Sequence, residues 1–180
     1  MTLCTAFDGH TMIATGPLAQ VAGAVKAAHD SGRAVLVFRD EDAQPVDLDL
    51  RGDLAAVLAR LPPGRGRPKL GVTAREVTLL PRHWDWLASQ PGGASVALRK
   101  LVETALREAE APDRMRRSRE AAYRFMTAVA GDLPDYEEAV RMLFAGDWTA
   151  FDAWTEAWPV DVRDYTRRLA EPGWRNGQGR

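Results

Sequence analysis

Apolar residues along the first sixty positions recur with alternating strand and helix periods. Thr5–Phe7 and Thr11–Ala14 flank the pair Asp8-Gly9, a turn signal in which glycine adopts a positive φ at little cost, and this predicts a β-hairpin. Leu18, Val21, Ala22 and Val25 then recur at helical spacing as far as about His29, with Ser31-Gly32 as the stop. The segment therefore begins as two strands followed by one helix.

Two further strands and a helix complete this part. The uninterrupted apolar run Ala34–Phe38 is typical of a buried strand, and Val46–Leu50 alternates apolar residues with aspartates as a half-buried strand does. Asp53 is placed to cap a helix whose apolar residues are Leu54, Val57, Leu58 and Leu61. We expect residues 1–61 to form a small mixed α/β domain of order β-β-α-β-β-α.

The pattern changes at Pro62. Residues 62–69 contain three prolines and two glycines and predict a linker, because proline blocks both helix interiors and central strands. Residues 70–110 then predict a strand–helix–helix segment. Its strand is Glu76–Leu80, its first helix runs from Pro81 to about Gln90, and its second is capped by Ser95 and limited by Pro112.

Helical periodicity fills the rest of the chain. Residues 118–170 carry four apolar stripes separated by Gly131, Gly146 and Pro159, which predicts short helices packed as antiparallel hairpins, with Trp148, Trp154 and Trp158 in the core. Residues 171–180 predict a frayed tail. The fold class expected is α+β: a small α/β part, a central strand–helix–helix and a C-terminal helical bundle.

Charge divides the chain in the same places. Residues 1–60 hold five Lys/Arg against eight Asp/Glu, residues 61–119 hold twelve against six, and residues 120–180 hold seven against eleven. A basic centre between acidic ends favours contact with an anionic partner through the middle third. The alternative is that these arginines lie on helices and linkers that are merely solvated.

Composition favours a globular protein without a membrane-spanning helix. Hydrophobic residues make up 46% of the 180 residues, which is enough for a packed core. No apolar stretch approaches the ~20 residues that cross a bilayer, and Met1–His10 lacks the features of a secretory signal. The single cysteine, Cys4, has no internal disulfide partner. We expect a cytoplasmic protein.

The linker carries a short basic motif. Arg65-Gly66-Arg67-Pro68-Lys69 resembles the core of an AT-hook, a peptide that lies in the minor groove of A·T-rich DNA. The narrow groove concentrates negative potential and attracts inserted arginine, while glycine keeps the backbone thin and proline keeps it extended. Basic linkers also produce such strings by chance, and the proline that usually precedes the first arginine is displaced by one residue.

The central segment resembles a ribbon-helix-helix DNA-binding module. The run Arg75–Pro81, a helix, Gly92-Gly93-Ala94-Ser95 and the helix from Val96 carry the resemblance. It implies a homodimer whose paired strands enter the major groove, with Arg75, Val77 and Leu79 or else Glu76 and Thr78 facing the bases, and a phosphate at the start of the second helix. Two apolar side chains on one strand face and an acidic one on the other depart from that family's pattern.

The DNA-contacting residues expected from both motifs are Arg65, Arg67, Lys69, Arg75, Thr78, Arg82, Ser95 and Arg99. In the alternative interpretation, the same segment packs into a larger α/β core with Trp84 and Trp86 inside it. The chain would then be a non-catalytic protein-interaction module.

The chain as a whole resembles an uncharacterised bacterial family, domain of unknown function 2239. The runs Gly66–Val72, Arg75–Trp84 and Gln90–Ser95 carry this resemblance, which extends over most of the chain. It implies a bacterial protein and brings no known activity with it.

Catalytic and metal chemistry find little support in the sequence. The three histidines, His10, His29 and His83, have no partner at metal-ligand spacing. Asp47, Asp49 and Asp53 could hold a divalent cation, although a solvated strand face explains them more simply. We expect no cofactor, no metal and no catalytic residue, and an enzyme whose site is assembled from distant residues remains the second alternative.

Overall fold

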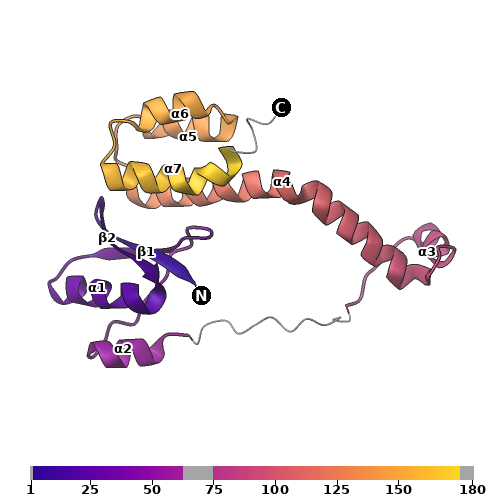
Figure 1. Ribbon diagram of the computed structural model, residues 1–180, viewed down its shortest axis with the longest axis horizontal. Coiled ribbons are helices and arrows are strands. Elements are labelled where there is room, and N and C mark those ends of the chain that lie inside the picture. The colour runs from indigo at the N-terminus through magenta and orange to yellow at the C-terminus, as the bar shows by residue number, and fades with distance from the viewer. Residues whose placement is uncertain (1, 63–74, 175–180) are drawn as a thin grey trace. The chain divides into compact units, whose positions relative to one another are not determined.

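The computed structural model describes residues 2–62 and 75–174, and the chain divides into two compact units. The first unit consists of Met1–Arg65 and Arg114–Arg180, and the second of Gly66–Asp113. Figure 1 shows the elements, which in chain order are β1 (Leu3–Asp8), β2 (Thr11–Pro17), α1 (Leu18–Asp30), β3 (Val35–Arg39), α2 (Leu54–Arg60), α3 (Pro81–Ala88), α4 (Gly93–Val129), α5 (Tyr136–Ala145), α6 (Trp148–Thr155) and α7 (Val160–Trp174). The expected α+β class with a helical C-terminal part is confirmed.

A three-stranded antiparallel sheet lies at the centre of the first unit, in the order β2-β1-β3. The hairpin predicted at Asp8-Gly9 is present, and Gly9 adopts a φ of 55° that suits a tight turn. β1 pairs with β2 from Leu3↔Pro17 to Asp8↔Thr11, with an irregularity between Ala6 and Phe7. On its other side β1 pairs with β3 from Cys4↔Arg39 to Asp8↔Val35.

Both faces of this sheet are covered. The side chains of Cys4 and Ala6 are buried in one cluster with Val21 and Val25 of α1 and with Val37 of β3. The alternate residues Phe7 and Phe38 enter a second cluster formed with α4, α5, α6 and α7. Since side chains alternate across a strand, β1 joins two layers into one body, with α1 on one face and the helical part on the other (Figure 1).

Four aromatic rings form the centre of the larger cluster. Phe125 of α4 lies 5.0 Å from the ring of Phe7, 5.3 Å from that of Phe38 and 4.6 Å from that of Tyr165, each centroid to centroid. All four side chains are at most 1% exposed. Tilted and edge-on arrangements at these distances are favourable for aromatic pairs beyond the burial of their area.

The C-terminal helices begin and end largely where the sequence predicts. α5 ends at Gly146, whose φ of 76° is the left-handed conformation that stops helices, and α6 is capped by Asp147, whose carboxylate accepts from the Ala150 amide at 3.0 Å. Trp158 is buried and its Nε1 donates to the Pro134 carbonyl at 2.8 Å. Trp154, expected in the core, is 39% exposed, so that prediction is wrong.

The strand predicted at Val46–Leu50 does not form. Val46, Leu48 and Leu50 do pack on the cluster beneath the sheet, as their alternation indicates, but the segment makes only one isolated bridge, Phe38↔Pro45, beside its first residue. The Val46 amide donates to the Val37 carbonyl of β3 at 2.8 Å, and within the described residues no further backbone bond joins Asp47–Leu50 to β3. The alternation therefore gave the correct burial and the wrong backbone state.

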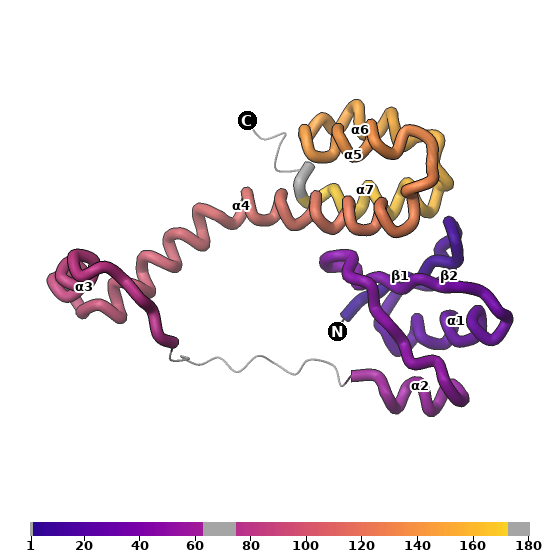
Figure 2. Tube along the Cα trace, turned by 180° about the vertical axis from the view of Figure 1, so that it is seen from behind, coloured from indigo at the N-terminus to yellow at the C-terminus, as the bar shows by residue number. Residues whose placement is uncertain are grey.

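The second helix of the central segment is much longer than expected. α4 continues through Pro112 and ends at Val129, so the helix limit predicted at Pro112 is wrong. A proline inside a helix costs about 3 kcal/mol, and good helix formers on either side, such as Glu110, Ala111 and Met115, act against that cost. Figure 2 follows α4 from the other side. None of the helices in the described part of the chain is long and apolar enough to span a membrane.

Candidate nucleic-acid interface

Residues 75–113 are the described part of the second unit. Arg75–Leu80 has no regular secondary structure, so the strand predicted at Glu76–Leu80 is not present in the single chain. Leu80 is extended, with φ −67° and ψ 150°, and Pro81 opens α3 at its first position, as the sequence predicts. A strand needs a neighbour to bond to, and among the described residues none lies beside this segment.

A glycine pair connects the two helices of this unit. Gly92 and Gly93 adopt φ values of 86° and 75°, a conformation open to glycine and costly for residues with a side chain. A Cβ at Gly92 would also lie 3.1 Å from Val96. α4 begins at Gly93, so Ser95 lies inside its first turn and is exposed. The expectation that Ser95 caps this helix is wrong.

Residues 75–113 bury almost nothing. Only Leu87 and Ala97 are buried among them, and neither belongs to the two core clusters. In contrast, seven large apolar side chains of this stretch are between 40% and 59% exposed: Val77, Leu80, Trp84, Trp86, Leu101, Val102 and Leu106. We call these seven residues the apolar surface. Trp84 and Trp86 therefore do not lie in the core of the chain.

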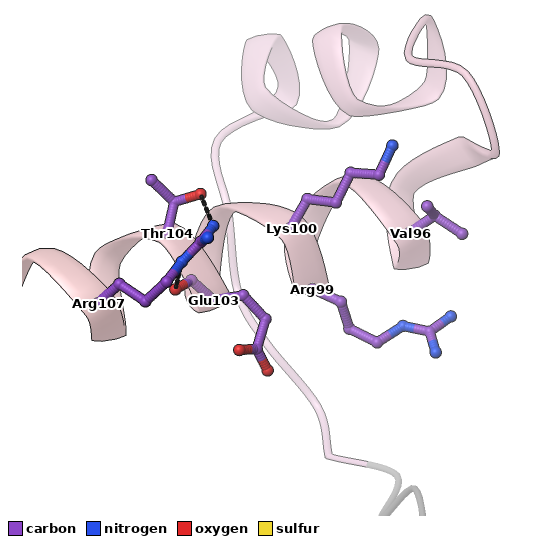
Figure 3. A pocket seen from close by; sticks show the side chains of 6 residues that line it. All are labelled: Val96, Arg99, Lys100, Glu103, Thr104 and Arg107. Atoms are coloured by element: carbon purple, nitrogen blue, oxygen red, sulfur yellow. Dashed lines mark hydrogen bonds between the residues drawn. The ribbon is translucent and has the colours of Figure 1, made fainter.

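The first half of α4 carries both apolar and cationic side chains. Leu101, Val102 and Leu106 belong to the apolar stripe that the periodicity predicts. An adjoining part of the helix surface bears an open hollow of about 560 Å³, shown in Figure 3 and lined by Val96, Arg99, Lys100, Glu103, Thr104 and Arg107. We call this second surface the basic face, because three of its six residues are cationic.

Two of its arginines donate hydrogen bonds to carbonyls of the helix backbone. Nε of Arg99 donates to the Ser95 carbonyl at 3.2 Å, and Nε of Arg107 donates to the Glu103 carbonyl at 3.2 Å. In Figure 3 the guanidinium group of Arg99 extends away from the helix, whereas Arg107 lies back along it toward Thr104. The contact between Ser95 and Arg99 is the one hydrogen bond that joins two predicted site residues within the described part of the chain.

The remaining predicted residues are distributed as follows. Arg75 and Thr78 are exposed in the irregular segment, and Arg82 is exposed in the first turn of α3. Arg65, Arg67 and Lys69 lie outside the described residues.

The aspartates considered for a cation have other partners. Asp49 pairs with Arg51 at 2.7 Å and with Arg60 at 3.5 Å, and the hydrogen bonds from Arg51 lower the pKa of its carboxyl. Asp53 caps α2 by accepting from the Ala56 amide at 2.8 Å. These contacts favour the solvated-surface interpretation. Burial raises the pKa of the Cys4 thiol, which works against a thiolate nucleophile.

The first unit contains a polar cavity that was not predicted from the sequence. It brings together Asp40, Arg124 and Arg168, which are too far apart along the chain for any local motif to link them. Arg114 and Arg117, which belong to the basic middle third of the chain, line the same cavity.

Comparison with known proteins identifies one relationship. A family model described as an uncharacterised protein conserved in bacteria matches residues 3–170. No curated protein and no solved structure matches the chain.

Proposed function

The chain belongs to the bacterial family DUF2239, whose model covers residues 3–170, and we propose that it is a DNA-binding protein. It acts as a homodimer and contacts DNA through residues 65–108. It is not a catalyst. The observation that carries the proposal is that the first half of α4 bears three exposed apolar residues of the apolar surface, Leu101, Val102 and Leu106, together with the basic face.

The apolar surface supports the dimer. A helix pair with only Leu87 and Ala97 buried has too small a core to be stable alone, and small units of this kind commonly gain stability by association. Contiguous exposed apolar side chains mark interaction sites in soluble proteins. A second copy offers the same apolar surface, so a two-fold symmetric contact would bury both at once.

The irregular segment Arg75–Leu80 supports the same arrangement. Within the described chain, the backbone amides and carbonyls of residues 75–79 make no backbone hydrogen bond. Val77 remains 53% exposed, so the segment is not committed to the interior of a monomer. Pairing with its counterpart in a second copy would satisfy these groups and form the two-stranded ribbon that the resemblance implies.

The cationic side chains supply the DNA contact. Arg99, Lys100 and Arg107 follow one another along the basic face. Arg75 and Arg82 are exposed before and within α3. Lysine and arginine that neutralise phosphates release counterions, so affinity should fall steeply as salt rises.

Fluorescence anisotropy with a mixed pool of DNA duplexes at low and moderate salt tests the proposal. We expect salt-dependent binding by the full chain, and weaker binding with a shallower salt dependence for the double variant Arg99→Ala/Lys100→Ala. The matched control, Lys26→Ala/Arg141→Ala, removes two cations from the first unit and should bind like wild type. Absence of binding at low salt, or equal binding by both variants, contradicts the proposal.

The linker is tested separately. The triple variant Arg65→Ala/Arg67→Ala/Lys69→Ala should weaken binding to all duplexes, with the largest loss on A·T-rich ones if the AT-hook resemblance is meaningful. An unchanged affinity would remove the linker from the interface while leaving the role of α4 intact.

A protein-interaction module is the second candidate, favoured by the exposed Trp84 and Trp86. Tryptophan is enriched among the residues that dominate protein interfaces. This candidate predicts that the chain shows no salt-dependent DNA binding and that the apolar surface is occupied by a different protein.

A further inference from the structure

The first unit contains a cavity of about 810 Å³ that the proposed DNA contact does not use. Its walls come from the start of β1, the loop after β3, the second half of α4 and the end of α7. The residues on which the argument depends are Leu3, Asp40, Asp42, Arg124, Arg168 and Leu169. A volume of this size lies in the range of ~300–1,000 Å³ typical of small-molecule sites.

Two helices supply the cationic wall. The guanidinium group of Arg124 donates to the backbone carbonyl of Asp42, which fixes it against the loop. The guanidinium group of Arg168 lies 4.6 Å from the centroid of the Tyr165 ring and 3.9 Å from the Asp40 carboxylate. Arg114 and Arg117 line the same cavity from α4. Guanidinium groups gathered from separate helices suit a phosphate, whose oxygens accept bidentate hydrogen bonds.

One carboxylate is held in a fixed orientation beside them. Oδ1 of Asp40 accepts from the Thr5 hydroxyl at 2.7 Å and from the Tyr165 hydroxyl at 3.0 Å, while the side chain is 23% exposed. Burial and the neighbouring Asp40 raise the pKa of Tyr165, which keeps its hydroxyl a donor. Since these contacts engage Oδ1, Oδ2 of Asp40 is the oxygen that can accept from a ligand hydroxyl.

The rest of the lining is mixed. Glu41, Ser118 and Glu120 add polar side chains, and Leu3, Leu169 and Pro172 contribute hydrocarbon, so the cavity is not a purely ionic surface. We propose that the cavity binds a phosphate ester of a small polyhydroxylated molecule, a nucleotide or a sugar phosphate. The phosphate contacts Arg124 and Arg168, a hydroxyl group donates to Asp40, and the carbon skeleton lies against Leu3 and Leu169.

Isothermal titration of the full chain, without DNA, tests this site. The probes are ADP and ribose 5-phosphate, with adenosine, ribose and inorganic phosphate as their partial counterparts. We expect one ester to bind at least about tenfold more tightly than its neutral counterpart and than inorganic phosphate. Preference for ADP identifies a nucleotide site and preference for ribose 5-phosphate a sugar phosphate site. No ester binding at millimolar concentration, or equal binding of the neutral compounds or of inorganic phosphate, overturns the proposal.

Two variants locate the binding. Arg168→Gln removes a cation from a side chain that is half exposed, and Leu3→Glu adds a carboxylate at a position 52% exposed, so neither disturbs the core. Each should weaken ester binding by about tenfold or more. Arg141→Gln, on an arginine outside the cavity that pairs with Glu138, should leave it unchanged. Equal binding by wild type, Arg168→Gln and Leu3→Glu would overturn the assignment. Because DNA is absent, failure here leaves the DNA-binding proposal untouched.

Discussion

Both halves of α4 carry an apolar stripe in the sequence, but the two stripes differ in burial. In the second half, Phe125 and Met126 are fully buried against the sheet and α7. In the first half, Val102 and Leu106 are 53% and 59% exposed. A helical stripe shows that a face will be buried and does not show what buries it. For the second half the partner is in the same chain, and for the first half we propose that it is a second copy.

Replacing Phe125 by Ala should produce the largest loss. The ring contacts three other aromatic rings in a closed core, so we expect the free energy of unfolding to fall by about 3–5 kcal/mol. Hydrogen exchange of the β1 amides in urea measures this in the first unit alone. Leu106→Ala, an equivalent truncation in the exposed half of α4, should change β1 protection by less than about 0.5 kcal/mol. Equal losses would mean that both halves of α4 are packed within one body.

Charging the apolar surface should have the next largest effect. The double variant Val102→Lys/Leu106→Lys places two cations where the proposed dimer buries hydrocarbon, so the dimer dissociation constant should rise by at least about 100-fold. Sedimentation equilibrium gives the constant directly. Leu54→Lys/Leu58→Lys alters two partly exposed leucines of α2 and should leave it unchanged. A wild-type chain that is monomeric at all concentrations would contradict the dimer.

Helix ends and turns were predicted correctly where the local residue type and the packing favour the same conformation. The turn at Gly9, the cap at Asp53 and the stop at Gly146 all lie where glycine or aspartate chemistry puts them. The prediction was wrong at Pro112, which usually ends a helix. α4 continues through this proline, with good helix formers such as Ala111 and Met115 on either side.

The candidate sites differ in the same way. Arg99 and Lys100 follow from a helical pattern that can be read along the sequence. The cavity around Asp40, Arg124 and Arg168 requires the tertiary fold, because no spacing rule relates residues so distant along the chain. The exposure of Trp84 and Trp86 was equally out of reach, since periodicity cannot distinguish a core face from an interface.

Gly146 offers a smaller test of the packed half. Its φ is 76°, and a Cβ there would meet the guanidinium group of Arg119, so Gly146→Ala should cost about 1–2 kcal/mol of unfolding free energy. Gly131→Ala is the control, since a Cβ at that position makes only ordinary contact, 3.5 Å from the Thr127 carbonyl. Urea unfolding followed by circular dichroism measures both. Equal costs would show that backbone conformation at Gly146 is not the cause.

Replacing Tyr165 by Phe should produce the smallest loss of stability, and this loss should depend on pH. Tyr165→Phe removes the hydrogen bond to Asp40 and should cost about 1 kcal/mol near neutral pH. Because the folded-state pKa of Tyr165 is raised above the unfolded value of about 10, its contribution is present below pH 10 and declines as the pH rises above it. The stability difference between wild type and Tyr165→Phe should therefore shrink as the pH rises from about 10 to about 11. A constant difference would contradict this origin.

DNA binding by the dimer-breaking variant tests the central claim most directly. Val102→Lys/Leu106→Lys adds positive charge to α4, so simple electrostatic attraction would strengthen its binding to duplex DNA. If DNA is instead held by a dimer formed through the apolar surface, anisotropy titration of this variant should show affinity reduced by at least tenfold despite the added charge. Affinity equal to or greater than that of wild type would contradict the account.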